Sequence, residues 1–362
     1  MRIINVIPQL VSGGGERFTI DLCNALADQG HDVALVVFFA PEGELGFYRN
    51  ELSDRVKFVT LNKKTGLDIT LAFRLRKVIH DFEPDIVNSH LRSMYYMPLS
   101  VLTTNAKFFH TIHNTADVEA ADVIGGAIRK WMFKTKRITP ITISLESLAS
   151  FEKYYGHTAP MIFNGRDIPE PLEVSESVKK EIDGFKKTAS TKVLVQVARF
   201  TDVKRQDLMA RVSKRLYEEG FDITVLLIGK KSEDIIKGIE EANCPICHVL
   251  GERKNPLEYL KAADAFCLCS TYEGMPISLI EAMGVGTIPV CTPVGGIINV
   301  VKDGETGFLS SDISEEAYYI ALKRFLQQSD SDAAEMKAKV KESYKPFTMR
   351  ECASKYVELY SK

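Results

Sequence analysis

The sequence predicts an α/β fold with two doubly wound domains, each a parallel sheet covered by helices on both faces. Short apolar runs alternate with segments of helical periodicity along most of the chain, which is typical of strands buried on both sides. The 362 residues exceed the size of a typical single core. Because the alternation stops near residues 168–172 and then restarts, we expect two domains facing an interdomain ligand cleft, at the carboxyl ends of both sheets.

The elements follow in order along the chain. Phe18, Leu22, Ala25 and Leu26 recur at helical spacing after the first strand, and residues 206–219 form a second clear helix pattern. A polar, lysine-rich stretch after residues 168–172 predicts a linker and a solvated helix. The predicted strands are residues 3–7, 33–39, 85–88, 108–112 and 139–143, and then 193–198, 223–228, 246–250, 265–269 and 288–291. We place the N-terminal domain at residues 1–168, the C-terminal domain at 169–345 and a last helix within 346–362.

Composition excludes several classes of protein. A net charge of −2 argues against a general nucleic-acid binder, and no apolar run is long enough to span a bilayer. The first residues have the pattern of a buried strand rather than of a signal peptide, so we expect a cytoplasmic protein with reduced thiols. Cys244 and Cys247 form a lone C-x-x-C pair. A zinc site needs a second pair, so we favour buried or incidental thiols over a metal site.

Residues 270–286 carry the most information in the chain. Glu273 and Glu281 are separated by seven residues, and Glu281 is the only charged residue from Gly274 to Gly286. A carboxylate among apolar side chains is costly to bury unless it is hydrogen-bonded. Pro276 suits the first turn of a helix, whose free N–H groups would then point toward the preceding loop and favour a phosphate there.

Two cations follow a predicted strand of the second half. Arg199 comes directly after that strand and Lys204 opens the next helix. Such a pair can clamp a diphosphate. Alone it could equally be surface charge, but opposite the two-glutamate loop we expect a site. The Gly295–Gly296 pair is open to two interpretations, backbone donors for a ligand or a structural turn.

The first strand leads into a glycine turn at Gly13, Gly14 and Gly15. Such a turn lets a phosphate or an acceptor approach the backbone closely, although a purely structural turn is the alternative. Phe18 stands where a dinucleotide fingerprint has its last glycine, and no acid ends the second strand. Both facts argue against a nicotinamide dinucleotide.

Three histidines lie in or after strands of the first half. His113 follows a strand's carboxyl end, where α/β proteins bind ligands, although a satisfied polar residue at a strand end is the alternative. We expect His110, inside the strand, to be structural, and we consider His90 a lesser site candidate.

Taken in order, these pieces resemble the retaining glycosyltransferases of family 4, which have the GT-B fold. The resemblance covers nearly the whole chain and is more specific in the second half. One departure is Asn299, near whose position the family often has an acid, and we interpret it as tuning of the site or as a structural change. The residues that carry the resemblance are Ser12, Gly13, Gly14, Gly15, His113, Asn164, Gly165, Arg199, Lys204, Glu273 and Glu281.

The resemblance implies a nucleotide-sugar donor bound mainly by the C-terminal domain. Arg199 and Lys204 would hold its diphosphate, Glu281 its ribose and Glu273 its sugar, and His113 would lie beside the transferred sugar. These residues, apart from Glu281, are the catalytic candidates. The last helix would cross back to the N-terminal domain. The implied donor-binding residues are Gly13, Gly14, Gly15, Arg199, Lys204, Glu273, Gly274, Met275, Pro276 and Glu281.

The implied activity is hexosyl transfer with retention, from a nucleotide-diphosphate sugar to a glycan or lipid-linked acceptor in cell-surface polysaccharide synthesis. Family frequency favours uridine over guanosine. Because two cations would stabilise the leaving group, we expect no metal and no other cofactor. The alternatives are another GT-B enzyme, such as an epimerase or a phosphorylase, and an inactive sugar-nucleotide-binding protein.

Residues 129–137 predict a further partner. From Arg129 to Arg137, five cations interleave with three large apolar side chains. Such a helix could rest on an anionic lipid surface, which would make the enzyme peripheral at the inner face of the membrane. The alternative is a buried apolar stripe with a solvated basic face.

Overall fold

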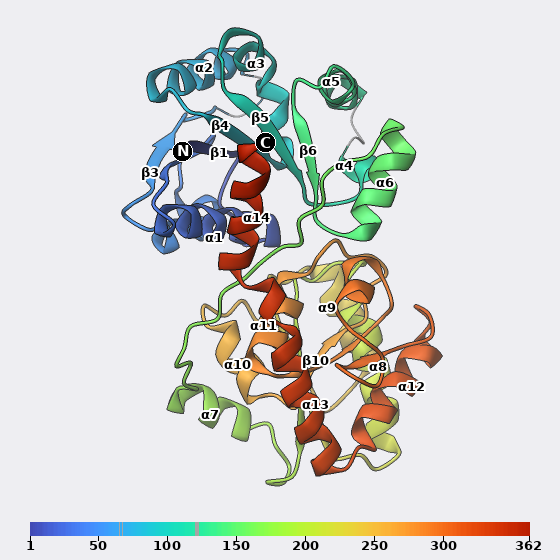
Figure 1. Ribbon diagram of the computed structural model, residues 1–362. Helices are drawn as coiled ribbons and strands as arrows, with labels where there is room; N and C mark the ends of the chain where they lie inside the picture. Colours follow the sequence, from blue (N-terminus) through green and yellow to red (C-terminus); the bar gives the residue numbers. More distant parts are fainter. Residues whose placement is uncertain (65, 67, 120–122) are drawn as a thin grey trace. The chain divides into compact units, whose positions relative to one another are not determined.

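The computed structural model describes residues 1–64, 66, 68–119 and 123–362, and it divides the chain into two compact units (Figure 1). Unit 1 contains Met1–Arg166 and Met349–Lys362, and unit 2 contains Asp167–Thr348. Each unit has its own six-stranded sheet, in which all neighbouring strands are parallel. The predicted fold class, two Rossmann-like α/β domains, is confirmed.

The sheet of unit 1 has the order β3-β2-β1-β4-β5-β6. Strand order reverses between β1 and β4, so the loops after these two strands flank the topological switch point, where such sheets bind ligands. The strands are β1 (Arg2–Ile7), β2 (Asp32–Val37), β3 (Lys57–Thr60), β4 (Ile86–His90), β5 (Lys107–Ile112) and β6 (Thr139–Thr142).

The helices of unit 1 bury apolar side chains in the core of the unit. α2, for example, buries Leu71, Leu75, Ile79 and Phe82, spaced three or four residues apart. The last helix packs against α1 and buries Tyr356 and Tyr360. The helices are α1 (Gly14–Asp28), α2 (Thr70–Phe82), α3 (Pro98–Thr103), α4 (Ala116–Glu119), α5 (Val123–Lys134), α6 (Leu145–Tyr155) and α14 (Met349–Ser361), with the 3₁₀ segment η3 (Leu91–Tyr96) after β4.

The sheet of unit 2 has the order β12-β11-β10-β7-β8-β9, and its switch point lies between β7 and β10. The strands are β7 (Lys192–Val197), β8 (Ile223–Ile228), β9 (Cys247–Gly251), β10 (Ala265–Leu268), β11 (Ile288–Cys291) and β12 (Phe308–Leu309). The helices are α7 (Glu176–Asp183), α8 (Gln206–Glu218), α9 (Glu233–Ala242), α10 (Pro256–Ala262), α11 (Ile277–Val285), α12 (Glu315–Leu326) and α13 (Asp330–Ser343), and η4 (Gly295–Asn299) follows β11.

Ten of these strands lie within two residues of their predicted limits. The sequence did not predict β3 and β12. Both are edge strands, and neither is a continuous buried run: β3 has no fully buried residue and β12 has only two residues. Among the described residues, no helix combines the length and the apolar character needed to cross a bilayer.

Candidate active site

In unit 2, the loops after β7 and β10 lie together at the switch point. β10 pairs directly with β7, so their carboxyl ends are neighbours. The backbone N–H of Thr271 donates to the carbonyl of Val203 at 2.9 Å, which joins the two loops. The residues that the sequence predicted for a diphosphate and a donor sugar are therefore carried by adjacent, hydrogen-bonded segments.

Lys204 and Glu273 meet across these loops. The Lys204 ammonium donates to Oε2 of Glu273, while Ser270 Oγ donates to Oε1 of the same carboxylate at 2.6 Å. The side chain of Glu273 is 4% exposed and that of Lys204 is 24% exposed. Glu273 is thus held in one orientation, and Lys204 is a cation that solvent or a ligand can still reach.

Arg199 lies on the same loop and is exposed. In the part of the chain that the structure describes, its guanidinium has no hydrogen-bond or ion-pair partner, so the structure does not join it to the Lys204–Glu273 pair. Its charge is available to an anion at this loop. Lys204 precedes α8 by two residues instead of opening it, because Arg205 is the N-cap.

Two buried glutamines fix the shape of this loop. Nε2 of Gln196, from β7, donates to the carbonyl of Lys204 at 2.8 Å, and Nε2 of Gln206, from α8, donates to the carbonyl of Arg199 at 3.0 Å. At Gly229, where φ is +150°, a Cβ would lie 1.9 Å from the Ala198 carbonyl oxygen. Only glycine permits this approach, which sets the exit of the chain from β7.

Glu281 lies on α11, and the residue is only 6% exposed. Pro276 is the N-cap of this helix, with extended backbone, rather than a residue of its first turn as the sequence predicted. The difference is one position, and the proline still donates no N–H at the helix start. Met275 is buried beside it at 4% exposure.

The Gly295–Gly296 pair is structural at least in part. The Gly296 N–H donates to the Gly274 carbonyl at 2.6 Å, and a Cβ on Gly296 would lie 2.3 Å from that oxygen. This donor is therefore used within the protein and holds the loop of Glu273 against η4. The interpretation of Gly296 as a backbone donor for a ligand is wrong.

In unit 1, the glycine turn and His113 meet at the start of α1. Gly13 is the N-cap of α1, and a Cβ on Gly15 would lie 3.5 Å from Nδ1 of His113. A Cβ on Gly13 would instead lie 2.4 Å from Oε2 of Glu16, so this carboxylate folds back over the turn. Because it already complements the positive end of the helix, the turn suits a neutral hydroxyl better than a phosphate.

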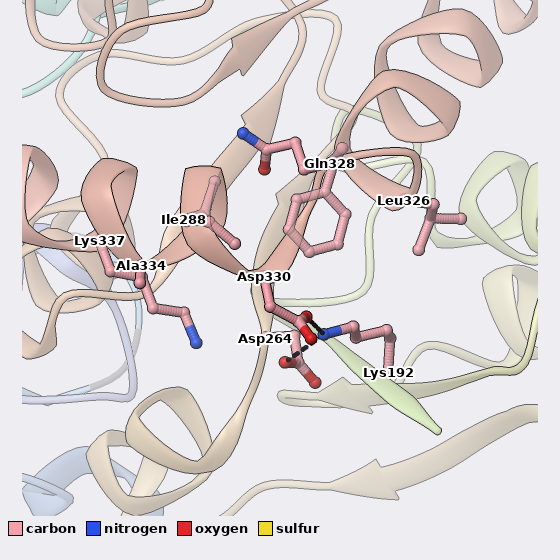
Figure 2. A pocket seen from close by; sticks show the side chains of 10 residues that line it. Lys192, Asp264, Ile288, Leu326, Gln328, Asp330, Ala334 and Lys337 are labelled. Atoms are coloured by element: carbon pink, nitrogen blue, oxygen red, sulfur yellow. Dashed lines mark hydrogen bonds and ion pairs between the residues drawn. The ribbon is translucent and has the colours of Figure 1, made fainter. Parts of the chain in front are cut away.

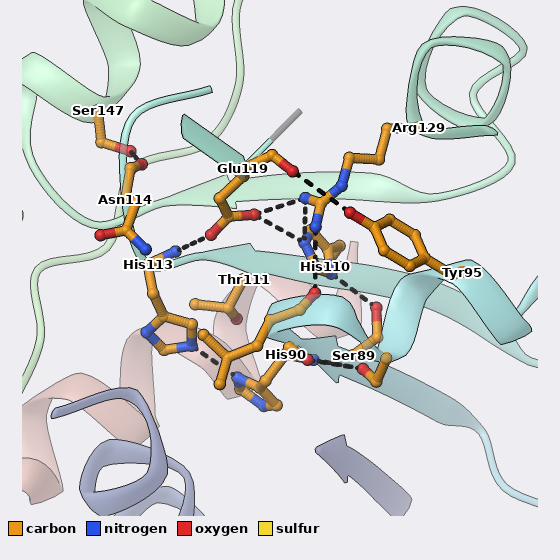
Figure 3. A network of polar contacts seen from close by, with 12 residues as sticks. Ser89, His90, Tyr95, His110, Thr111, His113, Asn114, Glu119, Arg129 and Ser147 are labelled. Carbon is orange, nitrogen blue, oxygen red and sulfur yellow. Dashed lines mark hydrogen bonds and ion pairs between the residues drawn. The ribbon is translucent and has the colours of Figure 1, made fainter. Parts of the chain in front are cut away.

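His113 is held on both sides in the arrangement of Figure 3. Its backbone N–H donates to Oε1 of Glu119 at 2.8 Å, and its Nε2 lies 3.1 Å from Nδ1 of His90. Burial lowers the pKa of His113 to about 4. The imidazole is therefore neutral near pH 7 and acts as a hydrogen-bonding group rather than a charge.

Glu119 connects His113 to a buried charge pair (Figure 3). Its Oε2 accepts from Nη1 of Arg129 at 2.5 Å, and the same guanidinium nitrogen lies 3.1 Å from Nε2 of His110. Burial alone would raise the pKa of Glu119, but the His110 hydrogen bond and the Arg129 charge lower it to about 2. His110 is structural, as the sequence predicted, since this residue of β5 is fully buried against the Glu119–Arg129 pair.

Comparison with known families decides the identity of the chain. Residues 12–168 match the model described as Glycosyltransferase Family 4, and residues 178–343 match the model described as Glycosyl transferases group 1. One model falls on each half, and together they cover most of the sequence. The chain is a retaining family 4 glycosyltransferase. The resemblance seen in its motifs is thereby confirmed, and so is enzymatic use of a nucleotide sugar.

Two curated relatives align with this glycosyltransferase over most of their length. N-acetyl-alpha-D-glucosaminyl L-malate synthase of Bacillus anthracis is 24% identical, over 96% of this chain and 93% of its own. An alpha-1,4-N-acetyl-D-galactosaminyltransferase of Campylobacter jejuni, named for a PP-undecaprenol-linked acceptor, is 22% identical over 85% and 84%. The crystal structure of Anabaena HepE in complex with UDP and glucose superposes with a TM-score of 0.80 at 17% identity, over 100% of both chains. This likeness shows the GT-B fold.

Sequence reasoning missed two residues of the glycosyltransferase that surround His113. Glu119 lies in a short helix without a strong pattern, and Arg129 was assigned to a lipid-facing helix. The structure corrects that assignment, because Arg129 is 1% exposed and paired with Glu119. A lone acid and a lone arginine on neighbouring helices were the only signal, and nothing in the sequence paired them.

Other candidate sites stay apart from this chemistry. A cavity between Lys192, Asp264, Gln328 and Asp330 lies at the amino ends of β7 and β11, away from the predicted site residues (Figure 2). Within the described residues, no cluster of histidine, cysteine and acidic side chains is suited to a metal ion. Burial raises the pKa of Cys247, which is the opposite of what a metal-binding or reactive thiolate requires.

Proposed function

We propose that this glycosyltransferase moves a hexose from a UDP-sugar to a glycan or lipid-linked acceptor, without a metal ion, in cell-surface polysaccharide synthesis. The observation that carries the proposal is the Lys204–Glu273 pair at the switch point of unit 2, beside the exposed Arg199. Lys204 and Arg199 offer two cations to a diphosphate, and Glu273 offers one fixed carboxylate to sugar hydroxyls. The UDP in the HepE structure and the undecaprenol-linked acceptor in the name of the Campylobacter relative support the uridine donor and the lipid-linked acceptor.

Each residue then has a distinct part in the reaction. The bond between the anomeric carbon and the diphosphate oxygen breaks, and the acceptor oxygen bonds to that carbon while its proton passes to the departing phosphate. Lys204 and Arg199 stabilise the negative charge of the leaving group, and one such donor typically contributes about 3 kcal/mol. Glu281 accepts from the ribose hydroxyls and Glu273 from the hydroxyls of the donor sugar, assisted by the backbone of Gly274, Met275 and Pro276.

In unit 1, His113 contacts the transferred sugar. Its neutral imidazole lies against Gly15, so the turn from Gly13 through Gly14 to Gly15 receives sugar or acceptor hydroxyls. We assign the phosphate to unit 2 alone, because Glu16 places a carboxylate over Gly13. This division refines the earlier expectation that the glycine turn assists the phosphates.

Calorimetry with UDP and GDP tests the donor assignment. We expect UDP to bind with higher affinity than GDP, and Glu281→Gln to weaken UDP binding while leaving the melting temperature unchanged. Transfer from UDP-sugars in excess chelator should equal transfer with added Mg²⁺. Preferential binding of GDP would reject uridine, and activity restored only by Mg²⁺ would reject metal independence.

We propose membrane contact for a smaller surface than the sequence predicted. It consists of the exposed residues of α5 and of the segment after it, without the buried Arg129. Lys130, Trp131, Lys134, Lys136 and Arg137 are exposed, with Trp131 at 42%. An aromatic ring among cations suits an anionic interface. We expect co-sedimentation with phosphatidylglycerol vesicles, reduced by Lys130→Glu with Lys134→Glu. The distant exposed Lys237→Glu serves as the control, and equal sedimentation of both variants would reject the surface.

A further inference from the structure

His90 is a fully buried histidine that the proposed chemistry does not use. It ends β4, and its Nδ1 lies 3.1 Å from Nε2 of His113. The rings of Phe18 and His113 pack in a T-shaped arrangement with their centroids 5.6 Å apart, and the Phe18 centroid lies 6.3 Å from that of His90. Glu119 holds the backbone of His113, and among the residues that the structure describes His90 is the polar side chain within hydrogen-bond distance of its ring.

We infer that His90 is a positioning residue, which fixes the ring orientation and the tautomer of His113 so that Nδ1 of His113 accepts a hydrogen bond from the sugar. The inference rests on the proposed role of His113 beside the transferred sugar. It adds that His90 orients the ring, that Nδ1 of His113 is the accepting atom, and that a buried hydrogen-bond network holds His90.

The proton positions follow from the far side of the His90 ring. Nε2 of His90 lies 3.1 Å from Oδ1 of Asn5, an oxygen that can only accept. When Nε2–H donates there, Nδ1 of His90 is left as an acceptor and takes the Nε2–H of His113. Nδ1 of His113 then carries no proton, and it is the ring nitrogen close to Gly15. The hydrogen bond from His90 to Asn5 thereby decides which ring nitrogen of His113 is the acceptor.

A buried chain of polar groups supports His90 from three strands and the last helix. Nδ2 of Asn88 lies 3.2 Å from Nε2 of His90, but its two hydrogens have acceptors in Oγ1 of Thr111 at 3.2 Å and Oδ1 of Asn5 at 3.4 Å. Nε2 of His90 can therefore keep its proton for Asn5. Oγ1 of Thr111 lies 3.2 Å from the hydroxyl of Tyr356 on α14. Asn5, Asn88 and Thr111 are each 0% exposed. Buried networks of this kind restrict side-chain rotation, so the last helix contributes to the placement of His113.

Two substitutions of His90 separate positioning from packing. The amide of asparagine reaches the place of Nδ1 and can keep the contact with His113, whereas that of glutamine reaches the place of Nε2 and keeps only the contact with Asn5. We expect His90→Gln to lower kcat by about tenfold, as for a misplaced reacting group. His90→Asn should retain most of the activity. Donor KM should stay within about twofold in both variants.

Nitrogen NMR of His113 gives a readout that requires no turnover. We expect a single Nε2–H tautomer in the wild type and in His90→Asn, and a mixture of tautomers in His90→Gln. Calorimetry with UDP should show unchanged affinity in both variants, since unit 2 is untouched. An equal loss of kcat in both variants, no loss in either, or an Nδ1–H tautomer in the wild type would overturn the inference. Absence of transfer by the wild type with any UDP-sugar would instead reject the proposed function, while the NMR comparison would still decide whether His90 fixes the ring.

Discussion

Units 1 and 2 share one topology but prepare their functional residues in different ways. Read from β9, the sheet of unit 2 has the same order as the sheet of unit 1, with two three-strand halves meeting at a central switch point. Unit 1 surrounds a neutral histidine with buried polar groups, whereas unit 2 places a reachable lysine against one buried carboxylate. The same scaffold thus presents a hydrogen-bonding ring from an interior network in one case and a charge from a surface loop in the other.

The largest expected effect breaks the buried charge pair of unit 1. Arg129→Met should reduce the free energy of unfolding by about 3–5 kcal/mol, because Glu119 is left buried without its cation. Urea unfolding followed by the fluorescence of Trp131, the single tryptophan of the chain, measures it. Lys134→Met, on the exposed side of the same helix, is the matched control, and equal stability of the two variants would contradict the pairing.

A second prediction breaks the corresponding pair of unit 2, where the effect should fall on activity. Lys204→Ala should lower kcat by about a hundredfold, since one donor to the leaving group is lost. Stability should fall less than in Arg129→Met, because Lys204 is partly exposed and Ser270 still donates to Glu273. Steady-state transfer at saturating donor measures it, with Lys237→Ala, a distant exposed lysine of unit 2, as the control. Unchanged kcat would remove Lys204 from the phosphate site.

A pH titration should distinguish the units without mutation. Burial lowers the pKa of His113 to about 4, and also lowers those of His90 and His110. Their unfolded value is near 6.5, so the unfolded chain binds more protons between these limits. The contribution of His113 to stability is complete above about pH 6.5 and is lost as pH falls through about 4, and the lowered pKa values of His90 and His110 act in the same direction. The Trp131 urea midpoint should fall over this window, and hydrogen exchange of β7 and β8 should change less. A midpoint independent of pH would contradict the buried neutral histidines.

The smallest effect concerns the far end of the network under His113. Tyr356→Phe removes the hydroxyl that contacts Thr111 and should cost about 1 kcal/mol of stability. We expect a kcat loss smaller than that of His90→Gln, since the change lies four contacts from His113 along the polar chain. Thermal unfolding and transfer assays measure both. A larger kcat loss than in His90→Gln would place the control of His113 in α14 instead.

Sequence and structure agree where local pattern determines the result. Continuous apolar strands predicted ten strands, and the spacing of Glu273 and Glu281 located the loop that meets Lys204. The short edge strands β3 and β12 escaped because sheet edges need no apolar run. The roles of Glu119 and Arg129 were missed because only long-range packing brings these two residues together beside His113. Arg129 shows the limit most clearly: its neighbours in sequence suggest a lipid surface, yet its partner lies on another helix in the interior.

The assignment of α14 to unit 1 also has a consequence for biosynthesis. Residues 1–166 emerge from the ribosome first. The helix that covers α1 and buries Tyr356 and Tyr360 is translated only after all of unit 2. In the nascent N-terminal half, the surface of α1 that packs against α14 therefore stays exposed during translation of unit 2. Unit 1 completes its packing only after α14 has been synthesised.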